Sequence, residues 1–143
     1  MKILHLDSGR EMRGGQWQVL RLHQALIESG HQSWLLARAG GPLLAIAAQR
    51  GLPCEPLTPL GVLNWSGNFD LVHAHDARTH TLGALFARVP LVVSRRVAFP
   101  IRSRWKYRHA ARYAAVSQFV KRVLMHRTMK PRRESSVQAG WRK

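Results

Sequence analysis

Short apolar runs alternate with segments of helical periodicity along most of this chain, and this alternation limits the possible folds more than any other feature. Apolar runs occupy residues 2–7, 33–37, 70–74, 91–94 and 113–116, with a shorter one at 54–57. Between them, apolar residues recur at helical spacing within 16–29, 43–50 and 79–88. Strands that alternate with helices form βαβ units, which build a parallel sheet with helices on both faces. We therefore expect an α/β fold, a Rossmann-like, doubly wound parallel sheet in a three-layer α/β/α arrangement.

Glycine and proline indicate where these elements end. Gly30 follows the first predicted helix, and Pro42 suits the first position of the second. Residues 52–69 hold four residues that break regular structure, so we expect an irregular segment there apart from the short strand. Further helices are expected around 104–111 and from Ser117, a suitable N-cap, to about residue 125.

Length and composition favour one globular domain. The chain has 143 residues, of which 45% are hydrophobic and 21% charged. Its only cysteine, Cys54, cannot form an internal disulfide, which favours a reducing compartment. No apolar run approaches the roughly 18–20 residues of a membrane-spanning helix. We expect a cytoplasmic protein whose domain spans 1–126, followed at 127–143 by a basic, disordered tail without helical or strand periodicity.

Basic charge is concentrated in the last third of the chain. Residues 1–90 carry 8 Lys and Arg against 6 Asp and Glu, whereas residues 91–143 carry 15 against 1. Such a surplus favours polyanions, anionic lipid surfaces or phosphorylated ligands as partners. Within it, aromatic residues alternate with cations, as at membrane interfaces and on nucleic-acid surfaces. We predict a membrane or acceptor patch made of Arg102, Arg104, Trp105, Lys106 and Arg108.

Ligands of doubly wound sheets bind beyond the carboxyl ends of the strands. Gly14, Gly15 and Gln16 follow the first strand and lie where a helix begins, so free backbone N–H groups there favour an anion. The glycines are equally compatible with a simple tight turn, and the absence of GxGxxG disfavours a plain NAD site. Arg95 and Arg96 lie just past another strand end, where guanidinium groups suit a phosphate or carboxylate.

Two histidines lie near the end of the strand in LVHAHD. His73 and His75 are two residues apart and therefore share a face of the strand. We interpret His73 as a structural histidine and His75, next to Asp76, as a hydrogen-bonding or acid–base group. A zinc site would need a third protein ligand at a suitable offset, and His80 falls on the following helix. We therefore expect no bound metal.

Five segments, in this order, resemble one known family: MKILHLDSG, the double-glycine loop, FDLVHAHD, VVSRRV and KYRHAARYAAVSQFVKRVL. They resemble the N-terminal domain of GT-B glycosyltransferases, in particular family 4, a glycogen-synthase-like group that includes lipopolysaccharide and cell-wall sugar transferases. The resemblance covers about residues 1–125. It implies half of a two-domain fold, in which this half binds mainly the acceptor and the other half binds a nucleotide-sugar donor without needing a metal.

The resemblance also implies roles for particular residues. Gly14 and Gly15 match the family loop near the donor diphosphate and the acceptor, and His75 matches a strand-end histidine that faces the cleft. We accordingly expect His75 to be catalytic. The residues expected to bind substrate or phosphate are Gly14, Gly15, Gln16, Asp76, Arg95, Arg96 and Ser117.

The family's donor-binding domain, with its paired glutamates, has no counterpart in this sequence. The tail from Arg127 resembles a frameshifted or prematurely ended reading frame, while a cut chain or a separate partner chain stays open. We expect little or no transferase activity from this chain alone, an anionic or lipid-linked sugar acceptor, and a peripheral position at the inner face of the membrane. The alternative is a stand-alone basic membrane-surface or nucleic-acid-binding module. Nucleic acid is the less favoured partner, since it leaves the strand-end glycines and histidine without a role.

Overall fold

The computed structural model of the chain describes residues 1–95 and 112–115. Within these ranges, one sheet of six strands has the order β3-β2-β1-β4-β5-β6, and every adjacent pair is parallel. The strands are β1 (Lys2–Asp7), β2 (Gln32–Ala37), β3 (Cys54–Pro56), β4 (Leu71–Ala74), β5 (Leu91–Arg95) and β6 (Arg112–Ala115). The helices are α1 (Gly14–Glu28), α2 (Pro42–Gln49), α3 (Pro59–Ser66) and α4 (Ala77–Phe86).

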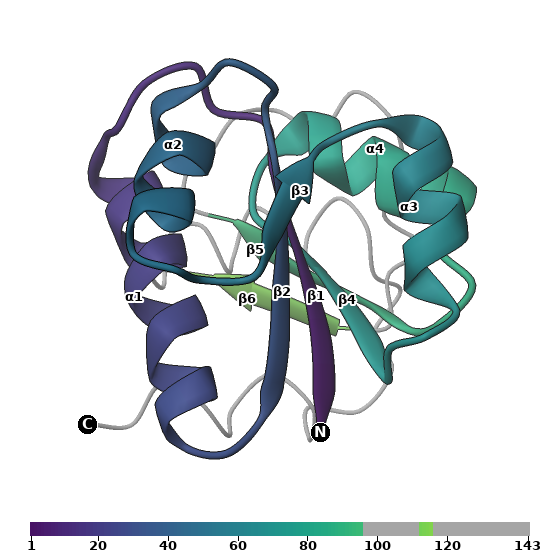
Figure 1. Cartoon of the computed structure of the whole chain (residues 1–143). Helices are drawn as coiled ribbons and strands as arrows, with labels where there is room; N and C mark the ends of the chain where they lie inside the picture. The colour runs from purple at the N-terminus through teal and green to yellow at the C-terminus, as the bar shows by residue number, and fades with distance from the viewer. Residues whose placement is uncertain (96–111, 116–143) are drawn as a thin grey trace.

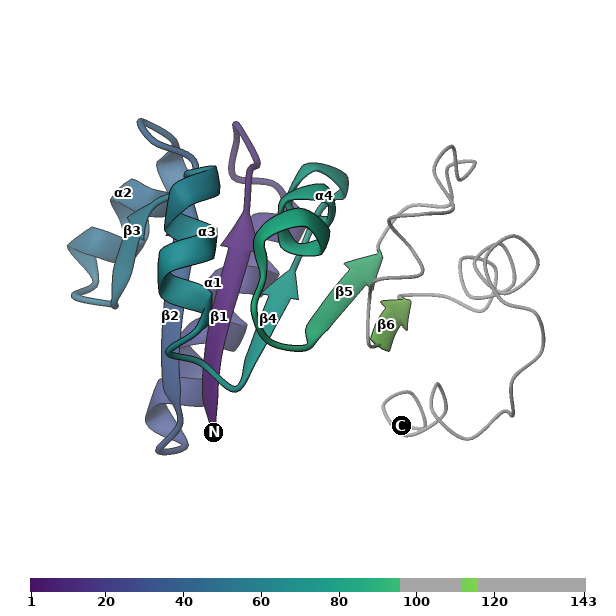
Figure 2. The ribbon, with the colours of Figure 1, turned by 90° about the vertical axis from the view of Figure 1, so that its right-hand side faces the viewer.

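The helices cover both faces of the sheet (Figure 1). Figure 2 shows α3 and α4 in front of the strands and α1 behind them. Two hydrophobic clusters fill the layers: one joins β2 to α1 and α2, and the other joins the central strands to α3 and α4. The Rossmann-like, three-layer α/β/α fold expected from the alternation is confirmed.

Strand β1 lies in the middle of the sheet and contributes to both layers. Leu4 and Leu6 are fully buried in the cluster beneath α3 and α4. His5 and Asp7 alternate with them and therefore face the α1 side, where they are also buried. From β1 the chain adds strands first on one side and then, from β4, on the other, so the loops after β1 and β4 diverge at this topological switch point.

Helix α3 lies within residues 52–69, where we expected an irregular segment, and this expectation is wrong. Thr58 is the N-cap, and its side-chain oxygen accepts a hydrogen bond of 2.8 Å from the Gly61 N–H. Pro59 is the first helical residue, where its missing N–H costs no hydrogen bond. Pro59, which would break a helix at an internal position, therefore begins one here.

Three further expectations are corrected or lie outside the described residues. Helices α1 and α4 each begin two residues earlier than predicted, at Gly14 and Ala77. Leu85 belongs to the apolar pattern that predicted a helix within residues 79–88, yet it is 54% exposed. The helices expected at 104–111 and 117–125 and the tail at 127–143 lie outside the described ranges. Among the described residues, no helix has the length and hydropathy needed to cross a membrane.

Candidate functional site

One carboxylate joins the ends of β1 and β4 at the topological switch point. Asp76 directly follows His75 at the end of β4, and Ser8 directly follows β1. The Asp76 carboxylate accepts hydrogen bonds from the Ser8 N–H (2.6 Å) and the Ser8 hydroxyl (2.9 Å). It also caps α4 by accepting from the Thr79 N–H at 2.8 Å. The loop after β1 and the first turn of α4 are thus held by the same side chain.

A second set of hydrogen bonds ties the start of α1 to the end of β1. The Gln16 side chain accepts from the Arg13 N–H (3.2 Å) and donates to Asp7 Oδ1 (3.3 Å). The Gly9 N–H donates to the same Asp7 oxygen at 2.8 Å. A Cβ on Gly9 would overlap the Gln16 side-chain amide, so this loop is closely packed. Gln16, expected to contact substrate, holds the loop in this structure.

The two glycines expected in the loop are the first two residues of α1. Gly14 is exposed, and a Cβ added to it would meet no atom within 4 Å. Packing therefore does not require glycine at this position. The first intrahelical bond runs from the Trp17 N–H to the Arg13 carbonyl at 3.1 Å, so the N–H groups of Gly14 and Gly15 precede it. They lie at the positive end of the helix dipole, which favours an anion.

Arg38, at the end of β2, belongs to the same edge and was not among the predicted site residues. Its Nη1 donates to the Ser8 carbonyl at 3.3 Å, which places a cation beside the loop after β1. The sequence did contain a signal for Arg38 as a site residue, because it directly follows the strand predicted at 33–37. Arg13 is engaged differently, in an ion pair with Glu11 at 2.9 Å in which both side chains are largely exposed.

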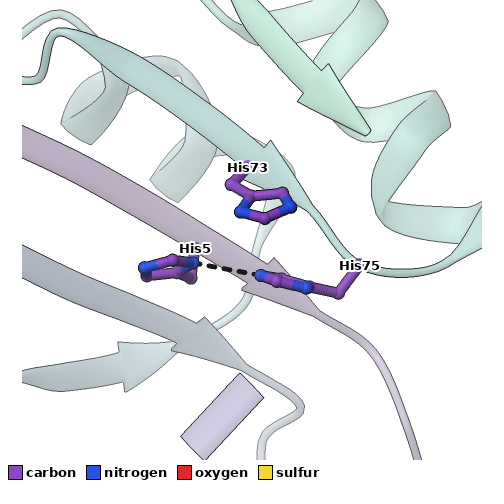
Figure 3. A group of neighbouring side chains, drawn as sticks. All are labelled: His5, His73 and His75. Carbon is purple, nitrogen blue, oxygen red and sulfur yellow. Dashed lines mark hydrogen bonds between the residues drawn. The ribbon is translucent and has the colours of Figure 1, made fainter. Parts of the chain in front are cut away.

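His75 lies at the carboxyl end of β4, as predicted, but its side chain is turned into a group of histidines (Figure 3). Its Nε2 is 3.0 Å from Nδ1 of His5, with which it forms a hydrogen bond, and the residue is only 4% exposed. The rings of His73 and His75 have their centroids 4.0 Å apart. His5 was missed at the sequence level, because nothing local in KILHLD indicates which strand lies beside it.

Hydrogen bonds to other elements fix the rings of His73 and of a fourth histidine, His23. His73 is half-buried, with Nε2 2.6 Å from the Ser94 hydroxyl on β5. His23 on α1 lies edge-on to His5, with Nδ1 2.6 Å from the Ser33 hydroxyl and Nε2 2.9 Å from the Pro53 carbonyl. The cluster therefore connects four strands and one helix on a single side of the sheet.

Burial lowers the pKa of two of these imidazoles, those of His5 and His23. It lowers the pKa of His5 well below the usual value, and the nearby His73 and His23 lower it further. Burial also lowers the pKa of His23, against a smaller opposite effect from the Pro53 carbonyl. Both rings are consequently neutral at physiological pH, when each offers one donor and one acceptor.

The other predicted site residues lie at or beyond the limit of the described structure. Arg95 ends β5 at the same carboxyl edge as Ser8 and Asp76, and only its backbone is described. Arg96, Ser117 and the patch formed by Arg102, Arg104, Trp105, Lys106 and Arg108 lie outside the described residues.

Comparison with known proteins gives the family and the fold. The sequence matches the Glycosyltransferase Family 4 model over residues 12–137. Anabaena HepE in complex with UDP is 20% identical with a TM-score of 0.72, and the match covers 88% of this chain and 40% of HepE. MurG of Acinetobacter baumannii is 14% identical with a TM-score of 0.69, covering 94% of this chain and 47% of MurG. No curated protein sequence gives a significant match.

The chain thus spans less than half the length of either solved structure. HepE and MurG are GT-B glycosyltransferases, and at these identities they establish the fold rather than the substrate. The family match extends over most of the chain, including the whole of α1, the end of β4 and the whole of α4. This chain belongs to glycosyltransferase family 4, and its sheet has the fold of the N-terminal half of a GT-B enzyme.

Proposed function

We propose that this chain is the acceptor-binding half of a nucleotide-sugar-dependent glycosyltransferase that acts on cell-envelope sugars, and that it transfers no sugar by itself. Family membership supports the reaction class. The HepE structures contain UDP, UDP with glucose, or UDP-glucose, which supports a nucleoside diphosphate sugar as the donor. The match to only 40% of HepE supports a separate donor-binding half.

The observation that carries this proposal is the Asp76–Ser8 connection at the switch point. It holds the loop after β1, which leads into the first N–H groups of α1, against the start of α4. Sugar transfer from a nucleoside diphosphate needs stabilisation of a departing diphosphate more than it needs a covalent intermediate. The N-terminus of α1, with Gly14 open for close approach, supplies such stabilisation, and in this proposal it also contacts the phosphate of the acceptor. In this proposal Arg95, Arg96 and Ser117 contact phosphate. His75, whose Nε2 faces His5, hydrogen-bonds the acceptor hydroxyl through Nδ1.

The test compares two glycine-to-alanine variants of the full chain. Gly14→Ala adds a methyl group where the proposed ligand approaches, whereas Gly67→Ala adds one after α3, with its closest contact at 3.5 Å to Arg88. Each variant is titrated with a short-chain lipid-linked sugar phosphate, and amide shifts are followed by NMR. We expect Gly14→Ala to lower the affinity by about tenfold, the effect of about 1.4 kcal/mol, and Gly67→Ala to leave it unchanged.

UDP-glucose and the same acceptor are then incubated with the unmodified chain, and release of UDP is measured. No release is expected, because in this proposal the donor is bound by the other half of the enzyme. Equal acceptor affinity in the two variants would contradict the proposed site. Sugar transfer by the chain alone would contradict the proposal that this half binds only the acceptor and needs another half to bind the donor.

The basic last third supports a further part of this proposal, docking to an anionic membrane surface. Residues 91–143 carry 15 Lys and Arg against one acid, and Trp105 lies within the predicted patch. Such a surface would hold the acceptor site near a lipid-linked substrate at the inner face of the membrane.

A further inference from the structure

We infer that His5, His73 and His75 form a binding site for a divalent transition-metal ion of the zinc class. The pair His73 and His75 resembles a metal-binding H-x-H pair that lacks a third ligand. The structure supplies that ligand from β1, 68 residues earlier in the sequence than His73. This site goes beyond the proposed sugar-transfer function, and it would revise the expectation that no metal binds.

The register of the sheet brings the three side chains together. His5 of β1 and His73 of β4 are direct partners across the parallel strands. His75 follows two residues later, and its N–H donates to the Leu6 carbonyl at 3.0 Å, which continues the pairing past the end of β4. Because side chains alternate along a strand, all three imidazoles project from the same face. Figure 3 shows the three rings directed toward one another.

The distances suit a four-coordinate ion with three protein ligands. Each histidine offers a nitrogen, and the three nitrogens lie within 4.8 Å of one another. Two ligands of a tetrahedral zinc with bonds of 2.0–2.1 Å lie about 3.3 Å apart. The His5–His75 pair already has its nitrogens 3.0 Å apart. Small ring rotations would therefore bring the set to coordination distance.

The surroundings of the rings also fit metal ligands. The His73–Ser94 hydrogen bond of 2.6 Å can fix the orientation of the His73 ring, as partners of the second nitrogen do in metal sites. Nδ1 is the His5 nitrogen that faces His75, so it is the atom placed to bind the ion, and coordination would replace the hydrogen bond between the two rings. Nε2, the other nitrogen of His5, is buried and has no hydrogen-bond partner in the described part of the chain. It would carry the proton of the neutral ring when Nδ1 binds the ion.

Charge compensation is available on the same face of the sheet. A divalent ion held by three neutral imidazoles keeps its full charge, which is unfavourable in a buried site. Asp7 is two residues from His5 on β1, projects from the same face and is 1% exposed. Its carboxylate, which accepts from Gly9 and Gln16, is thus placed to offset part of that charge. Imidazole ligands without thiolate favour zinc, copper or nickel over magnesium or calcium.

The experiment titrates the full, untagged chain, first freed of metal with a chelator, with Zn²⁺ by calorimetry and with Co²⁺ by visible absorption. We expect one tight Zn²⁺ per chain and the intense visible bands of tetrahedral Co²⁺. Loss of an outer hydrogen-bond partner lowers metal affinity by about 10–100-fold, which is the effect expected of Ser94→Ala. His73→Gln and His5→Gln each remove a ligand, so their affinity should fall by at least about 100-fold.

His31→Gln is the matched control, because His31 is exposed and lies at the opposite end of the strands. It should leave the Zn²⁺ affinity unchanged. Circular dichroism establishes that each variant is folded; His73 is only half-buried, so His73→Gln gives a folded variant if His5→Gln does not. Zn²⁺ binding that survives in a folded His73→Gln variant, or that falls equally with His31→Gln, would overturn the site. No sugar ligand is involved, so failure here leaves the proposed transferase function standing.

Discussion

Gly9 and Gly14 illustrate how two glycines in one short segment can serve different purposes. Gly9 lies against the Gln16 side chain, which in turn holds Asp7 and the Arg13 N–H. Gly14 has no neighbour that a methyl group would displace. At the level of single residues, the first glycine is required by packing and the second is available for a ligand.

Gly9→Ala should therefore destabilise the chain. Its methyl group would displace the Gln16 amide and disturb the hydrogen bonds at the start of α1, and overpacking of this kind costs about 1–3 kcal/mol. Gly14→Ala, which adds the same methyl group in open space, should leave stability nearly unchanged. Urea unfolding followed by circular dichroism measures both. Equal stability of the two variants would show that the Gly9–Gln16 contact does not constrain the loop.

Cys54 should react slowly with alkylating reagents in the folded chain. Burial raises the pKa of its thiol, and the neighbouring Glu55 carboxylate raises it further. The thiolate is the reactive form, so at about pH 8 a smaller fraction is reactive than in an ordinary cysteine with a pKa near 8.5. The measurement is the rate of reaction with iodoacetamide as pH is raised. The same chain in urea is the control, and identical pH profiles in the two states would contradict the prediction.

At the level of elements, most helices and strands could be predicted from apolar periodicity and from glycine or proline at their ends. The contacts between these elements could not. Strand β1, α2 and β4 were anticipated because periodicity and end signals are local properties of the sequence. Helix α3 was missed because Pro59 and Gly61 were interpreted as residues that break a helix. In the structure both lie in its first turn, where they are tolerated. The pairing of His5 with His73 depends on the register of two strands 68 residues apart, which no local pattern contains.

Asp76→Ala should destabilise two elements together. The carboxylate caps α4 through the Thr79 N–H and also accepts from Ser8, so its loss leaves several donors unsatisfied at a cost of about 1–3 kcal/mol. Asp76→Asn keeps one acceptor oxygen but presents an NH₂ group to the remaining donors. Its stability should therefore lie between that of the unmodified chain and that of Asp76→Ala. Ser8→Ala removes only the hydroxyl and is the milder control. Chemical unfolding of the unmodified chain and the three variants measures this order of stability. An Asp76→Asn variant as stable as the unmodified chain would contradict it.

On the scale of the whole molecule, the sheet and the charge divide the chain in different ways. The sheet joins residues from positions 2 to 115 into one layer. The charge separates residues 1–90, with nearly balanced signs, from the basic 91–143. The three-layer fold could be predicted from the sequence because it follows from alternation along the chain. The site could be predicted only as a region, because its hydrogen bonds connect segments that the sheet brings together.

The full chain should bind vesicles that contain phosphatidylglycerol and should not bind neutral phosphatidylcholine vesicles. Each Lys or Arg near an anionic surface contributes about 1 kcal/mol, and salt screens this attraction. Sedimentation at increasing salt measures this attraction. Arg104→Gln combined with Trp105→Ala should weaken it, and Arg88→Gln, which lies outside the predicted patch, is the control. Binding of duplex DNA with a steep salt dependence but no vesicle binding would favour the nucleic-acid alternative.

The double use of Asp76 has a consequence for motion. The loop after β1 and the first turn of α4 cannot open separately without breaking bonds to the same carboxylate. A ligand that holds the Ser8 loop in place therefore also slows opening at Thr79, on a helix that the ligand need not touch. Hydrogen exchange at the Thr79 amide would report the occupancy of a site on the neighbouring strand.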